Sequence, residues 1–191
     1  MTLFIVGLVL FLGVHSVSIV APAWRQRQIA QRGEKAWKGA YSVISLVGFG
    51  LLLYGYGLAR QAPVVLYTPP AALRHLALLL MVPVFPLLLA AYLPGRIQRT
   101  AKHPMLLAVK LWATAHLLAN GTLLAVLLFG AFLAWAVLDR ISTKRRIVPH
   151  VVPGAPASRF NDVIALAGGL GLYAAFVMGV HLWLIGVSPL R

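Results

Sequence analysis

Long apolar runs separated by short basic segments are the feature that most constrains this chain. Several runs approach 20 residues and contain few or no charged side chains. That is the length an α-helix needs to cross the hydrocarbon core of a bilayer. Helices satisfy all of their backbone hydrogen bonds within one segment, so runs of this kind indicate membrane-spanning helices. The sequence therefore predicts an all-α, polytopic membrane protein.

The composition supports this fold class and excludes several functions. Hydrophobic residues make up 61% of the chain and charged residues only 10%, whereas soluble domains average about a quarter charged residues. The net charge is +14, but the basic residues lie between the apolar runs, so membrane orientation explains them better than nucleic acid does. The absence of cysteine excludes disulfides and thiolate chemistry. No Gly-rich phosphate loop, nucleophile elbow or DNA-reading module is present, so nothing supports a kinase, hydrolase or nucleic-acid function.

We expect about six transmembrane helices in a single domain spanning residues 1–191. The first apolar run begins at Thr2 without a basic region or a small-residue cleavage site, so we interpret it as a retained helix. Pro83 and Pro86 should kink the third helix, and Asn120-Gly121 should form a turn after the fourth. The fourth is only about 22 Å long, so it either lies inside the protein or is partly re-entrant. The expected segments are 3–22, 41–59, 71–93, 104–118, 122–138 and 161–187.

The loop charges predict an orientation. With the N-terminus outside, the inner loops hold thirteen of the 17 basic residues, as the positive-inside rule requires. We therefore expect a bacterial inner-membrane protein with both termini in the periplasm. The thirteen residues are Arg25, Arg27, Arg32, Lys35, Lys38, Arg96, Arg99, Lys102, Arg140, Lys144, Arg145, Arg146 and Arg159.

Small residues predict where helices approach each other closely. Two sets stand out, one in the second expected helix and one at four-residue spacing in the sixth. They are Gly48, Gly50, Gly55 and Gly57, and Ala167, Gly171, Ala175 and Gly179.

Histidines are the most promising chemical groups, because ionisable side chains at membrane depth are costly and usually face a bundle interior or a pathway. The helical rise places His15 about 12 Å from the inner end of the first helix and His116 about 18 Å from the inner end of the fourth. These similar depths predict that His15 and His116 meet inside the bundle.

The pair favours a haem iron over other metals. Two imidazoles on facing helices can hold the iron axially, and a b-type haem needs no Cys-x-x-Cys-His attachment. No carboxylate lies deep in a helix, which argues against a hard cation or a di-iron centre. Zinc usually takes three or four protein ligands.

Other residues are weaker candidates. Trp112 lies one turn before His116 on the same helix face, so it can wall a cofactor pocket. His103 precedes a proline at a helix start and is either a simple cap or a functional group. His75 and His181 should lie near the outer boundary as interfacial residues. The basic residues that could contact haem propionates are Arg25, Arg99 and Lys102.

Two motifs resemble those of the NnrU family of bacterial inner-membrane proteins. They are GLVLFLGVHS (residues 7–16) and TAKHPMLLAVKLWATAHLLANG (residues 100–121). The likeness covers most of the chain, and the pairing of an early His-Ser with a later His-Pro…Leu-Trp-x-x-x-His…Asn-Gly is fairly specific. The family is associated with nitrite and nitric oxide metabolism in denitrifying bacteria. It is distantly similar to 15-cis-zeta-carotene isomerase, a membrane protein with b-type haem.

This resemblance implies haem b with His15 and His116 as the axial ligands. It implies a role in nitrite or nitric oxide metabolism, or haem-dependent cis-trans isomerisation of a carotenoid-like polyene. The expected partners are the bilayer and either a lipophilic small molecule or nitric oxide. One departure matters: the isomerase has a cysteine near the position of Ala113, and ligand exchange through that cysteine cannot operate here. Whether the protein is an enzyme therefore stays open.

Two alternatives remain. The protein can be a non-enzymatic scaffold or assembly factor whose histidines only hold helices together. It can also be an S-adenosylmethionine-dependent methyltransferase of the isoprenylcysteine type, which it resembles at Lys102-His103-Pro104. The acidic pattern of those enzymes is not evident, because Asp162 is the only acid after Asp139.

Overall fold

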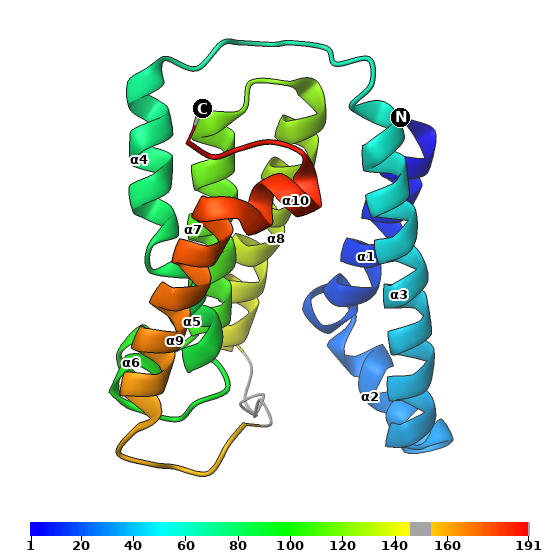
Figure 1. Ribbon diagram of the computed structural model, residues 1–191. Helices are drawn as coiled ribbons and strands as arrows, with labels where there is room; N and C mark the ends of the chain where they lie inside the picture. The colour runs from blue at the N-terminus through cyan, green and yellow to red at the C-terminus, as the bar shows by residue number, and fades with distance from the viewer. Residues whose placement is uncertain (146–153, 191) are drawn as a thin grey trace. The chain divides into compact units, whose positions relative to one another are not determined.

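The computed structural model describes residues 1–145 and 154–190, and its regular structure there is helical (Figure 1). The prediction that places Arg146 in an inner loop lies outside these residues. One isolated antiparallel bridge joins Val65 and Thr122. The elements are α1 (Thr2–Val20), α2 (Pro22–Arg32), α3 (Glu34–Ala59), α4 (Ala71–Met81), α5 (Val84–Ala90), α6 (Arg96–Ala101), α7 (Pro104–Ala119), α8 (Leu123–Arg145), α9 (Asn161–Ala175), the π-helix η1 (Phe176–Val180) and α10 (His181–Ile185).

The predicted fold class is confirmed: this is an all-α polytopic membrane protein. Within the described residues, five helical stretches are long and apolar enough to cross a bilayer. The fourth predicted segment is α7, a shorter apolar helix of 16 residues, as its predicted length implied. The five long stretches are Thr2–Val20, Glu34–Ala59, Ala71–Ala90, Leu123–Arg145 and Asn161–Ile185.

Prolines and glycines place the breaks between helices. The predicted kink in the third segment is a break between α4 and α5, with Pro83 at the N-cap position of α5. Proline lacks the backbone N–H that a continuous helix would need there. The basic segment after α1, expected to be a loop, instead forms the helix α2, which begins with Pro22 at its first position and ends before Gly33 (φ 83°). Proline suits the first turn of a helix and glycine suits a positive φ.

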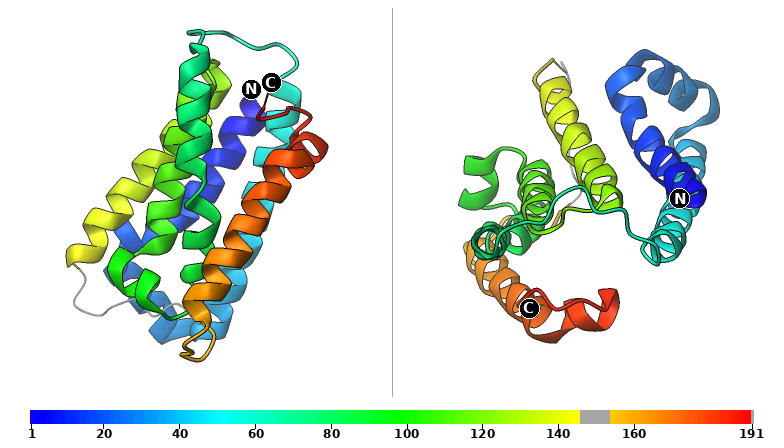
Figure 2. Two further views of the ribbon diagram at one scale, coloured as in Figure 1. Left: turned by 60° about the vertical axis from the view of Figure 1, so that its left-hand side comes forward. Right: turned by 90° about the horizontal axis from the view of Figure 1, so that it is seen from above.

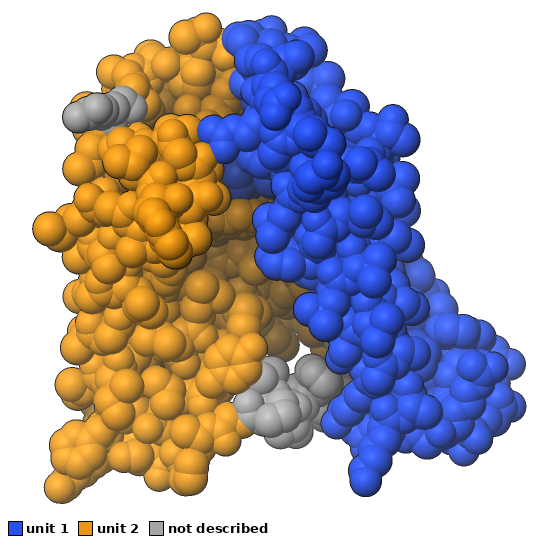
Figure 3. All heavy atoms as spheres, turned by 45° about the vertical axis from the view of Figure 1, so that its right-hand side comes forward, with its two compact units in different colours: residues 1–66, 122–131 blue, residues 67–121, 132–191 orange. Residues whose placement is uncertain are grey.

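The chain divides into two compact units, coloured separately in Figure 3. Unit 1 comprises residues 1–66 and 122–131, and unit 2 comprises residues 67–121 and 132–191. The helix α8 contributes its first residues to unit 1 and the remainder to unit 2.

In unit 1, α1 packs along α3 through glycines, and the two helices lie side by side in every view (Figure 2). A Cβ atom on Gly48 would lie only 2.7 Å from the backbone nitrogen of Phe11, and one on Gly55 would overlap the backbone of Phe4. Gly50 and Gly57 have no such neighbour within 4 Å. The predicted glycine packing is therefore confirmed for Gly48 and Gly55, which lie two turns apart on one face of α3.

Unit 2 is built around α5 and α7. Its core cluster contains Val84, Leu87 and Ala108, and partly buried apolar side chains from neighbouring helices surround it. The helix α9 packs against α5, and α4 packs against α7. This arrangement positions the last turns of α7, where the candidate site lies.

The helix α9 meets α5 through a different row of small residues from the one predicted. Ala165 is fully buried, and Gly169 lies against the backbone of Pro86 so closely that a side chain would not fit. The predicted row of Ala167, Gly171, Ala175 and Gly179 takes no part in this contact, since Ala167, Gly171 and Ala175 are exposed. Two residues correspond to roughly 200° of helix rotation, so the two rows lie on opposite faces.

Replacing Gly55 with alanine tests the packing of α1 on α3. The added methyl group would meet the backbone of Phe4, so we expect a loss of about 1–3 kcal/mol in the free energy of unfolding. Gly57→Ala on the same helix is the matched control, because it meets nothing within 4 Å and removes a helix-destabilising glycine. Denaturation in detergent micelles measures both variants, and equal stability would contradict the packing.

Candidate functional site

The helix α7 begins at the predicted His-Pro dipeptide. His103 occupies the N-cap position and Pro104 the first helical position. The His103 side chain makes no capping hydrogen bond, but its carbonyl oxygen accepts one from the backbone N–H of Leu107 at 3.0 Å. His103 therefore starts the helix through its backbone.

His116 is held in one orientation by its own helix. Its Nδ1 atom lies 2.8 Å from the carbonyl oxygen of Trp112. A carbonyl oxygen only accepts hydrogen bonds, so Nδ1 is the donor and the lone pair of the neutral ring lies on Nε2. The Trp112 and His116 rings are 5.3 Å apart, centroid to centroid, which confirms that the two share a helix face. Trp112 also contacts Phe132 of α8 edge-on at 5.5 Å.

The end of α7 is tied down just beyond His116. The Asn120 side-chain amide donates to the His116 carbonyl oxygen at 2.9 Å. The Tyr67 hydroxyl donates to the carbonyl oxygens of Leu117 and Asn120. Gly121 lies against the Tyr67 carbonyl, where no side chain would fit. The Asn-Gly dipeptide therefore ends α7 as predicted, and the structure adds Tyr67 as a second anchor of this turn.

His181 lies beside His116, although its sequence position predicted an interfacial residue. The two ring centroids are 6.4 Å apart and the rings are inclined by 30°. The π-helix η1 immediately precedes His181, and its wider turn changes the direction of every later side chain. Such π-turns are frequent at functional sites. Nothing in the local sequence signals a π-turn, so His181 could not be assigned to this site beforehand.

The ring of His181 is fixed by the C-terminal segment. Its Nδ1 atom lies 2.7 Å from the carbonyl oxygen of Val187. The chain reaches this position by reversing at Gly186, whose φ of 76° is readily adopted only by glycine. His181 thus has the same arrangement as His116, with Nδ1 donating to a carbonyl and the lone pair on Nε2.

His15 has a closely similar environment in unit 1. Its Nδ1 atom lies 2.6 Å from the carbonyl oxygen of Phe11, four residues earlier. The His15 ring lies 4.3 Å from the ring of Phe11 and 5.2 Å from that of Tyr41, measured between centroids. On α3, one turn after Tyr41, the Ser45 hydroxyl is buried and has no hydrogen-bond partner among the described residues.

The structure brings some of the candidate residues together and leaves others apart. Trp112, His116 and His181 form one cluster in unit 2, while His75 is exposed on α4. His15 belongs to unit 1, so its pairing with His116 stays a prediction. Within the described residues, no group of three or more His, Cys, Asp or Glu side chains could hold a metal ion.

Comparison with known proteins identifies the family. The family model described as NnrU protein matches residues 3–189, so the chain belongs to the NnrU family. No curated protein and no solved structure matches it.

The hydrogen bonds predict the same tautomer for three histidines. We expect the neutral rings of His15, His116 and His181 to carry their proton on Nδ1, because each Nδ1 faces a carbonyl oxygen. Nitrogen NMR of histidine-labelled protein in membranes measures this directly, with exposed His75 as the internal reference. Protonation at Nε2 in any of the three would contradict the arrangement at that residue.

Proposed function

We propose that this member of the NnrU family is a membrane-embedded b-type haem protein in which His15 and His116 would bind the haem iron. The observation that carries the proposal is shared by the two imidazoles. Each donates from Nδ1 to the carbonyl four residues earlier in its own helix, which leaves the lone pair on Nε2. Metal-ligating histidines typically donate their other ring N–H in this way, which fixes the ring and raises the basicity of the ligating nitrogen.

The surroundings of both imidazoles fit an apolar, planar group. His116 is flanked by Trp112, which itself contacts Phe132, and His15 contacts Phe11 and Tyr41. Aromatic walls of this kind exclude water from a bound macrocycle and tune its iron. The Ser45 hydroxyl, one turn from Tyr41 on α3, is a buried polar atom without a hydrogen-bond partner among the described residues, and a bound group could satisfy it.

The helices supply the remaining features that such a protein needs. The hydrogen bonds from Asn120 and Tyr67 hold the last turn of α7, so the His116 ring projects from a fixed backbone. When bound, the haem would supply an iron that exchanges electrons or binds nitric oxide. The alternating basic segments support an inner-membrane location with both termini in the periplasm.

A role in nitric oxide or electron chemistry is favoured over polyene isomerisation. The isomerase that the chain resembles has a cysteine where this chain has Ala113, and this chain contains no cysteine. Electron transfer would need only the iron and its two imidazoles, and nitric oxide could bind by displacing one of them. We therefore place the function of the protein in nitrite or nitric oxide metabolism.

The visible spectrum of protein purified in detergent after expression with ample haem tests the proposal. We expect a Soret band, and we expect haem occupancy to fall by more than about tenfold in His15→Ala and His116→Ala, because each removes an axial ligand. His75→Ala is the matched control, since His75 is exposed on α4 and should leave the spectrum unchanged.

Two results would contradict the proposal in different ways. A colourless protein whose histidine variants lose stability would favour the scaffold alternative. A Soret band that survives His15→Ala but is lost in His181→Ala would reassign the second ligand to His181, the imidazole that lies 6.4 Å from His116 between ring centroids.

A further inference from the structure

We propose that the arginine-lined pocket beside α6 and the start of α9 binds the phosphate of an anionic phospholipid. The pocket lies entirely in unit 2 and does not involve the histidine site. It is open and has a volume of about 870 Å³. Its walls come from two stretches of chain, residues 94–99 and 157–166.

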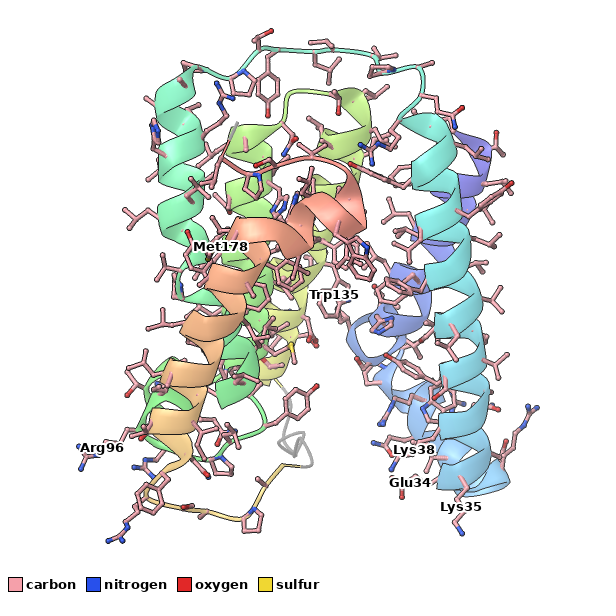
Figure 4. All side chains as sticks on the ribbon, viewed as in Figure 1. Glu34, Lys35, Lys38, Arg96, Trp135 and Met178 are labelled. Atoms are coloured by element: carbon pink, nitrogen blue, oxygen red, sulfur yellow. The ribbon has the colours of Figure 1, made fainter. Side chains whose placement is uncertain are left out.

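The pocket is strongly cationic. Arg96, Arg99 and Arg159 line it and are exposed, while Asp162 is the one acidic residue among its lining residues. In Figure 4, Arg96 extends away from the ribbon beside α6. Guanidinium groups form paired, charge-assisted hydrogen bonds with phosphate oxygens, so a cluster of three favours a phosphate ligand.

The Asp162 carboxylate in the pocket is hydrogen-bonded to the backbone. One Asp162 carboxylate oxygen accepts the N–H of Arg96 at 2.8 Å and the other accepts the N–H of Ile97 at 3.0 Å. Gly95 lies so close to this carboxylate that a Cβ atom there would displace the Asp162 side chain. Asp162 thus fixes the backbone under the pocket, and both of its oxygens already have partners other than the guanidinium groups.

A second anchor keeps the two walls together. Asn161 is only 3% exposed, and its side-chain amide donates to the carbonyl oxygens of Pro94 at 2.9 Å and Pro156 at 3.0 Å. The Arg159 side chain makes a cation–π contact, since its guanidinium carbon lies 4.8 Å from the centroid of the Phe160 ring. A stacked guanidinium keeps the donors at its edge available for an anion.

The remaining wall is apolar, which favours a lipid over a free anion. Val163 and Leu166 line the pocket and are 61% and 50% exposed. They lie on α9, at the start of a stretch apolar enough to cross a bilayer. The pocket therefore joins a cationic mouth to a surface that suits an acyl chain. Basic pockets of this kind near the cytoplasmic side of a membrane bind anionic headgroups, and the loop charges predict that side for these arginines.

Lipid titration of the delipidated full-length protein, followed by native mass spectrometry, tests the assignment. We expect cardiolipin to bind and phosphatidylcholine not to bind. Arg96→Gln with Arg159→Gln should weaken cardiolipin binding roughly 25-fold, because each basic side chain near the headgroup contributes about fivefold. Arg27→Gln with Arg32→Gln is the matched control, since it removes the same charge from exposed positions of α2 and should change binding less than about twofold.

Two further measurements distinguish a lipid headgroup from free phosphate, and loss of the site from misfolding of the variant. Inorganic phosphate at the lipid's concentration should not displace cardiolipin, and displacement would overturn the lipid assignment. Equal weakening in both double variants would overturn the pocket as the site. The pair Arg96→Lys with Arg159→Lys keeps the charge but loses the paired guanidinium hydrogen bonds, so its binding should lie between that of the unaltered protein and that of the glutamine pair. Loss of binding in that pair as complete as in the glutamine pair would also overturn the proposal.

Discussion

Backbone hydrogen bonding inside a bilayer is the constraint on which the rest of this structure depends. Water is absent from the hydrocarbon core, so each N–H and C=O group must find a partner within the protein, and helices provide it. The same carbonyl oxygens also accept hydrogen bonds from polar side chains. Ser16, His15 and His116 all bond to the carbonyl four residues earlier. Polar groups are thus tolerated in these spans because the helix itself satisfies one of their atoms.

That constraint has a chemical consequence at the histidines. A carbonyl acceptor selects the Nδ1–H tautomer and places the lone pair on Nε2. The hydrogen bond that satisfies the ring N–H therefore also fixes the tautomer that the proposed haem ligation requires. His181 reaches the same state by another route, through the carbonyl of Val187 after the chain reverses at Gly186. Outside the histidine cluster, Asp162 and Asn161 follow the same logic, since their side chains bond to backbone groups at the corner before α6.

The fold was easier to predict from the sequence than the site, for a physical reason. The positions of the spans follow from the length of the apolar runs, and the break at Pro83 and the end of α7 at Asn120 follow from local chemistry. The helix α2 was not predicted. Its residues are mostly polar, and a search for apolar runs alone therefore assigns them to a loop. The row of α9 that meets α5 is not the small-residue row that the sequence singled out, as Gly169 and not Gly171 makes the contact. A helix that is apolar all round carries no stripe to show which face packs.

The sequence by itself determined the membrane class, the approximate spans and the basic segments between them, and it singled out His15 and His116 as candidate site residues. The tertiary structure alone decided which glycines carry the packing, that His181 lies beside His116, and that Asp162 holds the backbone beneath three arginines. Each of these depends on the rotation of one helix about its axis. A single π-helical turn or a shift of two residues changes that rotation. The sequence does not reveal the rotation, because the side of a helix that faces lipid and the side that faces protein are both apolar.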